Sequence, residues 1–225
     1  MLPLLATLAA SIAAVPAATG TEAVTRMVAP RAAAVQAPPI VKRWVPYGLG
    51  RRRQMAAYSQ RHYGQRTHRL EPKVIVEHFT QTNTTGSAWR TFAANSPDVE
   101  FHELPGVCAH FLIERSGRIL STAPIGWRCR HTVGLNHRAI GIEHVGMSDS
   151  QVMGNRRQLA ASLKLTAWLR CRYGIANRDV IGHNESLSSR WYHERVKAFR
   201  GRTHDDMKPA TMRRYRQLVA RTKCS

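Results

Sequence analysis

Short apolar runs along the chain predict the strands of a central sheet. Three of them look buried: residues 73–79 (KVIVEHF), 109–115 (AHFLIER) and 139–146 (AIGIEHVG). The SGRI sequence after the second run is a turn signal, and it predicts a hairpin that returns through residues 118–124. A further short strand is expected at 179–183 (DVIGH), so the pattern predicts a sheet built from several buried strands.

In the segments between these strands, apolar residues recur at helical spacing. The predicted helices cover residues 51–63, 87–95, 155–174 and 209–222. The third helix brings four side chains near one face: Leu159, Leu163, Thr166 and Leu169. Threonines before residue 87, Gly174 and Pro209 stand where helix caps and first turns favour them. Strands that alternate with helices predict an α/β fold.

The 225 residues suffice for one sizeable core, and a second full domain would be cramped. Residues 1–18 are apolar and uncharged, and we interpret them as a secretory signal peptide. The missing Lys or Arg at its start leaves a membrane anchor or a wrongly assigned start as alternatives. Residues 19–45 are rich in Ala, Val and Pro without a period, so we expect a flexible lead there and a folded domain at 46–225.

The four cysteines fit an exported protein with two disulfides. None lies in a CxxC pair, which argues against a cysteine zinc knuckle. Spacing leaves all three pairings open. We favour Cys108–Cys129 and Cys171–Cys224 because each would join neighbouring elements, and free buried thiols are the alternative.

Charge changes the picture of the surface. Lys and Arg number 34 and Asp and Glu 14, which gives a formal net charge of +20. Such a charge attracts polyanions, whether nucleic acid, an anionic cell-wall polymer or a lipid surface. The arginines are spread widely, without an RNA-binding signature or a helix-turn-helix pattern, and there is no GxGxxG or P-loop. We therefore expect no specific nucleic acid partner.

Two histidines close predicted strands, where α/β proteins build their sites. His78 ends the first strand, His183 ends the last, and the acid-rich THDDM segment (203–207) follows. Two imidazoles and one Asp from THDDM would supply the three protein ligands of a catalytic zinc site. The HExxH helix motif is absent, since HERVK at 193–197 lacks the second histidine. The alternative is that both histidines are structural and THDDM is a solvated loop.

Glu143 stands in the apolar AIGIEHVG strand, which should not bury a carboxylate without a purpose. A carboxylate beside a metal site can accept a proton from water. The alternative is that Glu143 faces solvent or pairs with an arginine. His144 is its neighbour in the strand and therefore points to the opposite face, outside the site.

With these residues in view, the chain resembles the zinc-dependent N-acetylmuramoyl-L-alanine amidases of type 2, which include the peptidoglycan recognition proteins. The resembling stretches follow the family's order: KVIVEHFT, AHFLIERSGRI, WRCRHTVGLNHRAIGIEHVG, and IGHNES followed by THDDM. The long central string is the most specific of them. The resemblance implies one α/β domain, with a central mixed sheet flanked by helices, as the catalytic domain at 46–225.

The resemblance also implies roles for single residues. The zinc ligands would be His78, His183 and Asp206. Glu143 would assist the attacking water, and His204, two positions before Asp206, would stabilise the oxyanion.

Two points in this assignment stay open. Asp205 would point away from the metal, but His204 could itself be the third ligand. The stretch 186–202 (SLSSRWYHERVKAFRGR) is longer than in compact family members, and its His193 could compete for a role. In the central string, we expect His131, Asn136 and His137 to bind the muramyl group or the stem peptide, unless the last two cap a turn.

The function implied by the resemblance is hydrolysis of the amide between N-acetylmuramic acid and L-alanine in peptidoglycan, with Zn2+ as cofactor. The enzyme would be a monomer, secreted or wall-associated (periplasmic in a double-membrane bacterium), and held to anionic wall polymers by its charge. One alternative is a non-catalytic peptidoglycan-binding protein of the same fold, which would lack a ligand. Another is a secreted basic metal-dependent nuclease, although its histidine and asparagine ligands would be needed in one compact unit.

Overall fold

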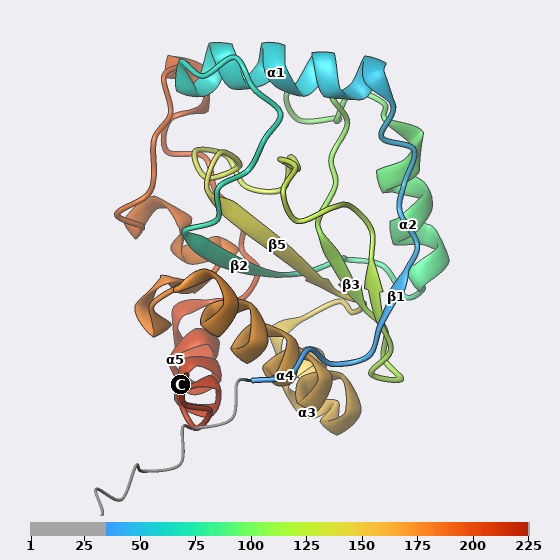
Figure 1. The fold of residues 1–225 in the computed structure, drawn as a ribbon, viewed down its shortest axis with the longest axis vertical. Helices are drawn as coiled ribbons and strands as arrows, with labels where there is room; N and C mark the ends of the chain where they lie inside the picture. Colours follow the sequence, from blue (N-terminus) through green and yellow to red (C-terminus); the bar gives the residue numbers. More distant parts are fainter. Residues whose placement is uncertain (1–34, 225) are drawn as a thin grey trace, which may run out of the picture. The chain divides into compact units, whose positions relative to one another are not determined.

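Six strands form one mixed sheet in the computed structural model, which describes residues 35–224 (Figure 1). In chain order they are β1 (Ile40–Lys42), β2 (Val74–Phe79), β3 (Phe111–Ile113), β4 (Ile119–Ser121), β5 (Ala139–His144) and β6 (Val180–Gly182). In space the order is β1-β4-β3-β5-β2-β6, and β3 and β4 form the antiparallel pair. The α/β class, the five strands predicted from apolar runs and the hairpin are confirmed.

The parallel strands β5, β2 and β6 position the residues expected in the site. His78 on β2 lies opposite Glu143 on β5, and Glu77 lies opposite Gly182 on β6. The carboxyl ends of parallel strands meet at one edge of a sheet. His78, Glu143 and His183, the residue after β6, therefore come to the same edge.

Within the described residues, five α-helices flank the sheet: α1 (Leu49–Tyr63), α2 (Thr85–Ala94), α3 (Asp149–Gly154), α4 (Arg156–Tyr173) and α5 (Pro209–Val219). The predicted caps are confirmed. Thr84 accepts the amide of Ser87 before α2, Gly174 takes φ 63° after α4, and Pro209 begins α5. Figure 1 shows α1 and α2 on one side of the sheet and α3, α4 and α5 on the other.

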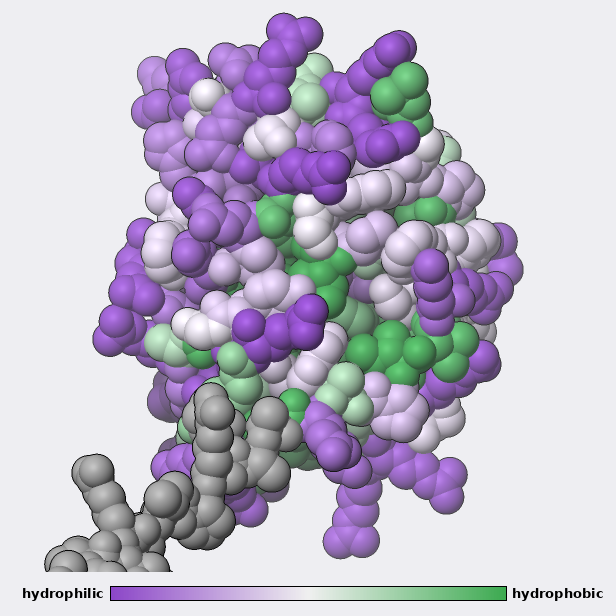
Figure 2. Space-filling view, viewed as in Figure 1, coloured by the Kyte–Doolittle hydropathy of each residue, from purple (hydrophilic) through white to green (hydrophobic). Residues whose placement is uncertain are grey.

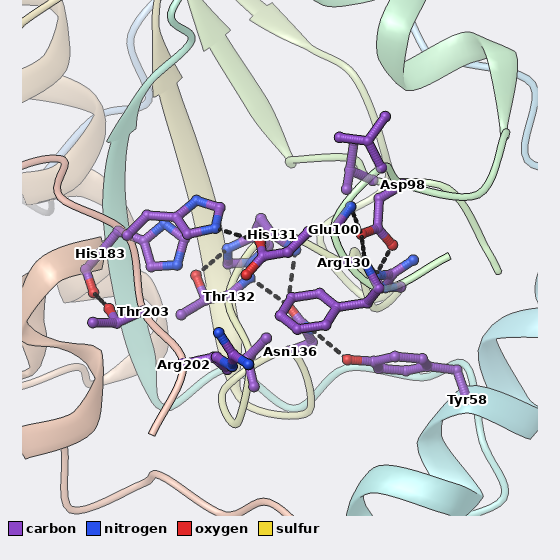
Figure 3. Close-up of a pocket in the computed structure, with 15 residues that line it drawn as sticks. Tyr58, Asp98, Glu100, Arg130, His131, Thr132, Asn136, His183, Arg202 and Thr203 are labelled. Carbon is purple, nitrogen blue, oxygen red and sulfur yellow. Dashed lines mark hydrogen bonds and ion pairs between the residues drawn. The ribbon is translucent and has the colours of Figure 1, made fainter. Parts of the chain in front are cut away.

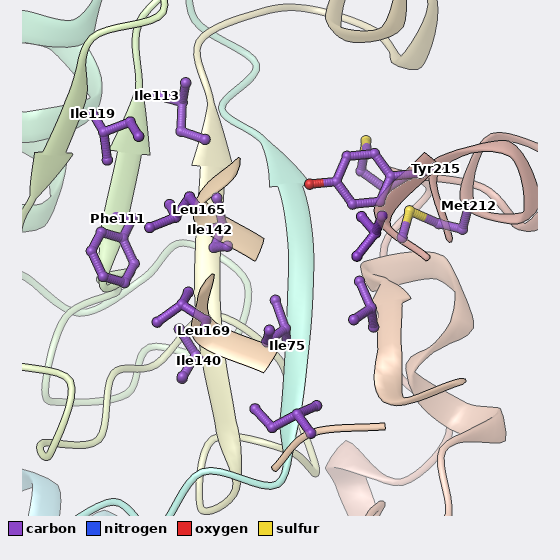
Figure 4. Close-up of a cluster of buried hydrophobic side chains, with 14 of the residues drawn as sticks. Ile75, Phe111, Ile113, Ile119, Ile140, Ile142, Leu165, Leu169, Met212 and Tyr215 are labelled. Carbon is purple, nitrogen blue, oxygen red and sulfur yellow. The ribbon is translucent and has the colours of Figure 1, made fainter. Parts of the chain in front are cut away.

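Hydrophobic side chains fill the space on both faces of the sheet. On one face, strand residues such as Ile75 and Ile140 pack against Leu165 of α4 and Met212 of α5 (Figure 4). On the other face a second cluster joins β3 and β4 to α2 and to the first disulfide. The strands that carry His78 and Glu143 are therefore held from both sides.

The buried face of α4 differs from the predicted one. Thr166 and Leu169 are buried as expected, but Leu159 and Leu163 are only half-buried. Buried polar residues take inner positions instead. Gln158 donates to the carbonyl of Ile113 in β3 at 2.9 Å and to that of Val145, just after β5, at 3.1 Å, so its burial leaves no amide proton unpaired there. An apolar pattern cannot reveal such positions, because a polar residue reads as a surface residue.

The predicted lead at 19–45 was wrong in its last residues. Ile40, Val41 and Lys42 form β1 and pair in parallel with β4, and Val45 is buried in the second hydrophobic cluster. Three residues are too few for a recognisable alternation, and it is pairing with β4 that makes them a strand. The predicted signal peptide at 1–18 lies outside the described residues.

Both favoured disulfides, Cys108–Cys129 and Cys171–Cys224, are present, each with Cα atoms 5.1 Å apart. The second ties the segment after α5 to α4. Hydrophilic side chains cover much of the face drawn in Figure 2. Between residues 35 and 224, no helix is long and apolar enough to cross a membrane.

Candidate metal centre and pocket

Three side chains meet at the carboxyl edge of β2 and β6. Asp206 lies between two histidines: its Oδ2 is 3.1 Å from Nδ1 of His78, and its Oδ1 is 3.1 Å from Nδ1 of His183. One possible ligand atom from each residue lies within 4.8 Å of the others, and all three residues are buried. The structure thus brings together the three predicted ligands, which we call the triad.

A close backbone contact carries Asp206 to β6. The amide of Asn184 donates to the Asp206 carbonyl at 3.0 Å. A Cβ on Gly182 would lie 1.7 Å from the carbonyl oxygen of Met207, so only glycine permits this approach. From the other side, Asp149 of α3 accepts the amide of Met207 at 2.8 Å. The THDDM segment is therefore fixed against the end of β6.

Both ring nitrogens of His78 have a neighbour. Nδ1 faces Asp206, and Nε2 lies 3.1 Å from Nδ1 of His131. The second nitrogen of a metal-binding histidine is usually engaged by a neighbour in this way.

Burial and charge drive the pKa values of the triad apart. Burial alone would lower the pKa of His78, but the carboxyl groups of Asp206, Glu143 and Glu77 together outweigh this effect and raise it. Burial lowers the pKa of His183 to about 4. Burial would raise the pKa of Asp206, but hydrogen bonds from both histidines hold it well below its usual range. Asp206 is therefore ionised and His183 neutral near pH 7, which are the forms that bind metals.

The chemistry of the donor set fits zinc. Two imidazole nitrogens and one carboxylate oxygen make up the protein ligands of known catalytic zinc sites, which keep a fourth position open. Calcium and magnesium prefer all-oxygen sites, so the two histidines argue against them.

Glu143 lies beside His78 at the same edge. It is half-buried, and its Oε2 has no hydrogen-bond partner among the described residues. Burial raises the pKa of Glu143 to about 7; the charge of His78 lowers it and that of Asp206 raises it. A carboxyl group that titrates near neutrality can both accept and donate a proton. No arginine within residues 35–224 pairs with it, so the predicted ion-pair alternative does not hold.

His204 lies next to the triad. Its ring centroid is 4.7 Å from that of His183, and its Nε2 is 2.9 Å from Oε2 of Glu100. Asp205 is exposed and pairs with Lys208 at 2.8 Å, so it points away from the triad as expected.

A pocket of about 180 Å³ opens beside the triad (Figure 3). Residues from α1, from the loop after α2, from 130–136 and from 202–204 line it. In Figure 3, His183 and Thr203 lie at one end and Asp98 and Tyr58 towards the other. The pocket gives an extended molecule room to reach the triad.

The three predicted substrate contacts have different positions. His131 and Asn136 line the pocket. Asn136 is buried, and its Oδ1 accepts the amides of His131 and Thr132 at 2.8 Å each, so it also holds a turn. His137 does not line the pocket, which argues against a substrate contact: it is buried and stacks on Tyr63 with centroids 4.4 Å apart. The GLNH sequence alone cannot predict that neighbours from elsewhere in the fold bury His137.

Two walls of the pocket were not predicted from the sequence. In the loop after α2, Val99 is 93% exposed and lines the pocket together with Phe101. Apolar residues alternating with acids, as in VEF, were the available signal. The other wall is the end of the long 186–202 stretch, where Arg202 lines the pocket. His193 is exposed and joins neither the triad nor the lining.

Buried His62 of α1 contacts residues from both walls of the pocket. Its Nδ1 is 3.0 Å from Glu194 in the long stretch, and its Nε2 is 3.0 Å from Glu103 in the loop after α2. Phe199 contacts the His62 ring edge-on, with ring centroids 4.8 Å apart, and packs at a tilt against Phe101, with centroids 4.3 Å apart. The long stretch is thus part of the folded domain and shapes the pocket.

Comparison with known proteins assigns the chain to a family. The family described as N-acetylmuramoyl-L-alanine amidase (Amidase_2) matches residues 68–207, which is more than half of the chain. No curated protein matched the chain.

Solved structures share the fold at low sequence identity. LysCS, an endolysin N-acetylmuramoyl-L-alanine amidase from Clostridium intestinale URNW, is 20% identical with a TM-score of 0.50; the match covers 83% of this chain and 97% of that one. LysC from the same organism is 21% identical with a TM-score of 0.50, covering 82% and 97%. The hydrolase AmiA from Staphylococcus aureus is 19% identical with a TM-score of 0.50, covering 82% and 81%.

Proposed function

Because the chain belongs to the N-acetylmuramoyl-L-alanine amidase family and is therefore a peptidoglycan amidase, we propose that it works as an exported, zinc-dependent enzyme. The bond cut is the amide between N-acetylmuramic acid and L-alanine of the stem peptide. The observation that carries the proposal is the buried group of His78, His183 and Asp206, beside which Glu143 keeps an unpaired carboxylate oxygen.

The chain's own residues divide the work at this site. His78, His183 and Asp206 would hold the ion through two nitrogens and one oxygen. When bound, zinc supplies a Lewis acid that polarises the scissile carbonyl and lowers the pKa of water. Glu143 takes a proton from the attacking water and passes it to the leaving amine, which suits a pKa of about 7.

His204 stabilises negative charge on the scissile carbonyl oxygen. Its half-exposed ring lies beside His183, and it can exchange its bond to Glu100 for a bond to substrate. A donor aimed at a developing oxyanion contributes more in the transition state than in the ground state.

The pocket beside the triad would hold the muramyl group and the stem peptide. His131 and the apolar wall of Val99 and Phe101 offer contacts along it. Arg202 lines the pocket without an ion-pair partner among the described residues, so its charge can meet a carboxylate of the peptide.

Export is supported by features outside the triad. The apolar, uncharged residues 1–18 suit a signal peptide, and two disulfides suit an oxidising compartment. The net charge of +20 would hold the enzyme on an anionic cell wall.

The test is digestion of purified peptidoglycan after zinc reconstitution, with the products identified by mass spectrometry. The proposal expects glycan chains freed of peptide, together with peptides that begin with L-alanine. Plasmid DNA treated in parallel should stay intact, since its degradation would indicate the nuclease alternative. Binding to peptidoglycan without any product would indicate the non-catalytic alternative. Activity that survives complete removal of metal would refute zinc dependence.

A further inference from the structure

A buried network of polar side chains lies behind the triad, on the opposite face of β2 and β5. The network begins at His144, the strand neighbour of Glu143. Nδ1 of His144 is 2.7 Å from the carbonyl oxygen of His78. A carbonyl oxygen can only accept, so His144 donates this hydrogen bond through Nδ1–H.

From His144 the contacts continue into the two helices that cover this face. Nε2 of His144 accepts from Ser162 of α4 at 2.7 Å, and Ser162 lies 2.5 Å from the hydroxyl of Tyr215 of α5. That hydroxyl is also 2.9 Å from Oγ1 of Thr166, which donates to Glu77 at 2.8 Å. Figure 4 shows the hydroxyl of Tyr215 directed towards β2.

All five of these side chains are fully buried. Polar groups are retained in a core only where hydrogen bonds replace those lost to water, and an apolar cluster would pack α4 and α5 against the sheet without this requirement. The position of the contacts suggests why polar residues stand here. Glu77 precedes His78 in β2, and His144 follows Glu143 in β5. Helix α4 is therefore hydrogen-bonded to both strands next to the positions that carry site residues, and α5 is hydrogen-bonded to α4 in turn.

We propose that His144 is a positioning residue that sets the place of the metal-binding nitrogen of His78, with Ser162 and Tyr215 holding His144 in turn. This inference rests on the proposed zinc site. Nδ1 of His78 is separated from its own Cα by three bonds, so a shift of the backbone moves the ligand atom almost equally. Groups that orient metal ligands typically change metal affinity or activity by about 10- to 100-fold when they are removed.

Two substitutions of His144 separate positioning from packing. His144→Phe keeps a ring of similar size but has no donor for the His78 carbonyl. His144→Asn leaves a space behind β5, yet its amide NH2 can occupy the place of Nδ1–H. If His144 positions His78, the Phe variant should bind zinc about 10- to 100-fold more weakly than the wild type. The Asn variant should be less stable but should bind zinc with near wild-type affinity.

Gln158→Leu is the matched control. Gln158 is a buried polar residue of α4, the helix of Ser162, and it also donates to backbone carbonyls, those of Ile113 in β3 and of Val145 just after β5, but it makes no hydrogen bond to a residue of the site. Its loss should lower the melting temperature of the metal-free protein and leave zinc affinity unchanged. Zinc affinity is measured by competition with a chelator, without substrate, and kcat and KM are then measured on a soluble muropeptide.

Two results would overturn the inference while leaving the zinc enzyme intact. One is unchanged zinc affinity and kcat in His144→Phe. The other is an equal loss of affinity in Gln158→Leu, which would reduce the effect to general destabilisation. Failure of the proposed function looks different, because the wild-type protein itself would then bind no zinc.

Discussion

Glu143 has the two properties that a proton acceptor needs, a free carboxylate oxygen and a pKa near neutrality, which burial raises to about 7. Glu143→Gln keeps the shape of the side chain and removes only the proton acceptor. We expect zinc content to stay constant while turnover falls on the order of 100- to 10,000-fold. Metal analysis and muropeptide hydrolysis on the same preparation test this. Turnover near the wild-type rate would make Glu143 a structural residue.

Substitutions of Asp206 and of His204 should impair the enzyme in different ways. Asp206→Ala removes a proposed ligand, so zinc affinity and activity should fall together. His204→Ala should keep its zinc and lose about 100- to 1,000-fold in kcat, as for a lost oxyanion donor, with KM changing less. His204→Lys places a cation there and should restore part of the rate.

Asp205→Ala is the control, because Asp205 is exposed and faces away from the triad. Its zinc content and rate should both stay close to those of the wild type. Loss of zinc in His204→Ala, with zinc retained in Asp206→Ala, would show that His204 is the third ligand instead.

Single residues of the site were predictable where strand geometry decides their position. His78 lies near the end of buried β2 and His183 directly follows buried β6, and parallel strands end at one edge. Asp206 depended on the family resemblance, because nothing in THDDM distinguishes it from Asp205. His137 could not be placed from sequence, since its burial against Tyr63 depends on a helix far away in the chain.

Elements were predictable where the apolar run is long. β2 and β5, with six residues each, were identified from the run of apolar residues, and the helices α1, α2, α4 and α5 from spacing and caps. β1 and α3 were not predicted: β1 is three residues between Pro39 and Arg43, and α3 has only six residues. β3 and β4 are equally short, but a longer apolar run and a turn signal revealed them. The loop after α2 has no regular structure, and its role as a pocket wall arises from contacts with the long stretch before THDDM.

The end of β6 offers a test of how the site is assembled. Gly182→Ala would place a Cβ 1.7 Å from the Met207 carbonyl oxygen, so the THDDM segment must move away. We expect loss of most zinc affinity and a lower melting temperature. Gly154→Ala in α3, where nothing lies within 4 Å, should change neither zinc affinity nor activity. Unchanged zinc binding in Gly182→Ala would mean that Asp206 is not a ligand.

The walls of the pocket should respond to pH through His62 of α1. Burial alone would lower the pKa of His62, but Glu103 and Glu194 outweigh it and raise the pKa above the value of the unfolded chain. Protonated His62 therefore stabilises the fold fully below about pH 6.5, and this contribution is lost as pH rises through the folded-state pKa.

His62→Gln removes this titration. The melting temperature of the wild type should exceed that of His62→Gln by most at acidic pH, and the difference should shrink above about pH 6.5. Thermal unfolding of both proteins in metal-free buffers from about pH 5.5 to pH 8.5 tests this. A difference that grows with pH would contradict the direction argued here.

The whole chain carries a formal net charge of +20. If this charge holds the enzyme on the wall, binding of the inactive Glu143→Gln variant to whole cell walls should weaken strongly between about 0.05 and 0.5 M salt, because screening shortens the reach of surface charge. Hydrolysis of a small soluble muropeptide by the wild type serves as the control and should change much less. Cell-wall binding that does not change with salt concentration would mean that the pocket alone recognises the wall.

The triad joins distant parts of the chain, since His78 and Asp206 are 128 residues apart. A bound ion would therefore act as a third cross-link beside the disulfides, whose residues are 21 and 53 apart. In a chain-entropy view, closing a loop of this size stabilises a fold by about 4–5 kcal/mol. Unlike a disulfide, this link can be withdrawn by any competing chelator. If the enzyme is exported and binds zinc as proposed, its lifetime outside the cell would follow the local supply of zinc, and scarce zinc would shorten the survival of the folded protein as well as lower its activity.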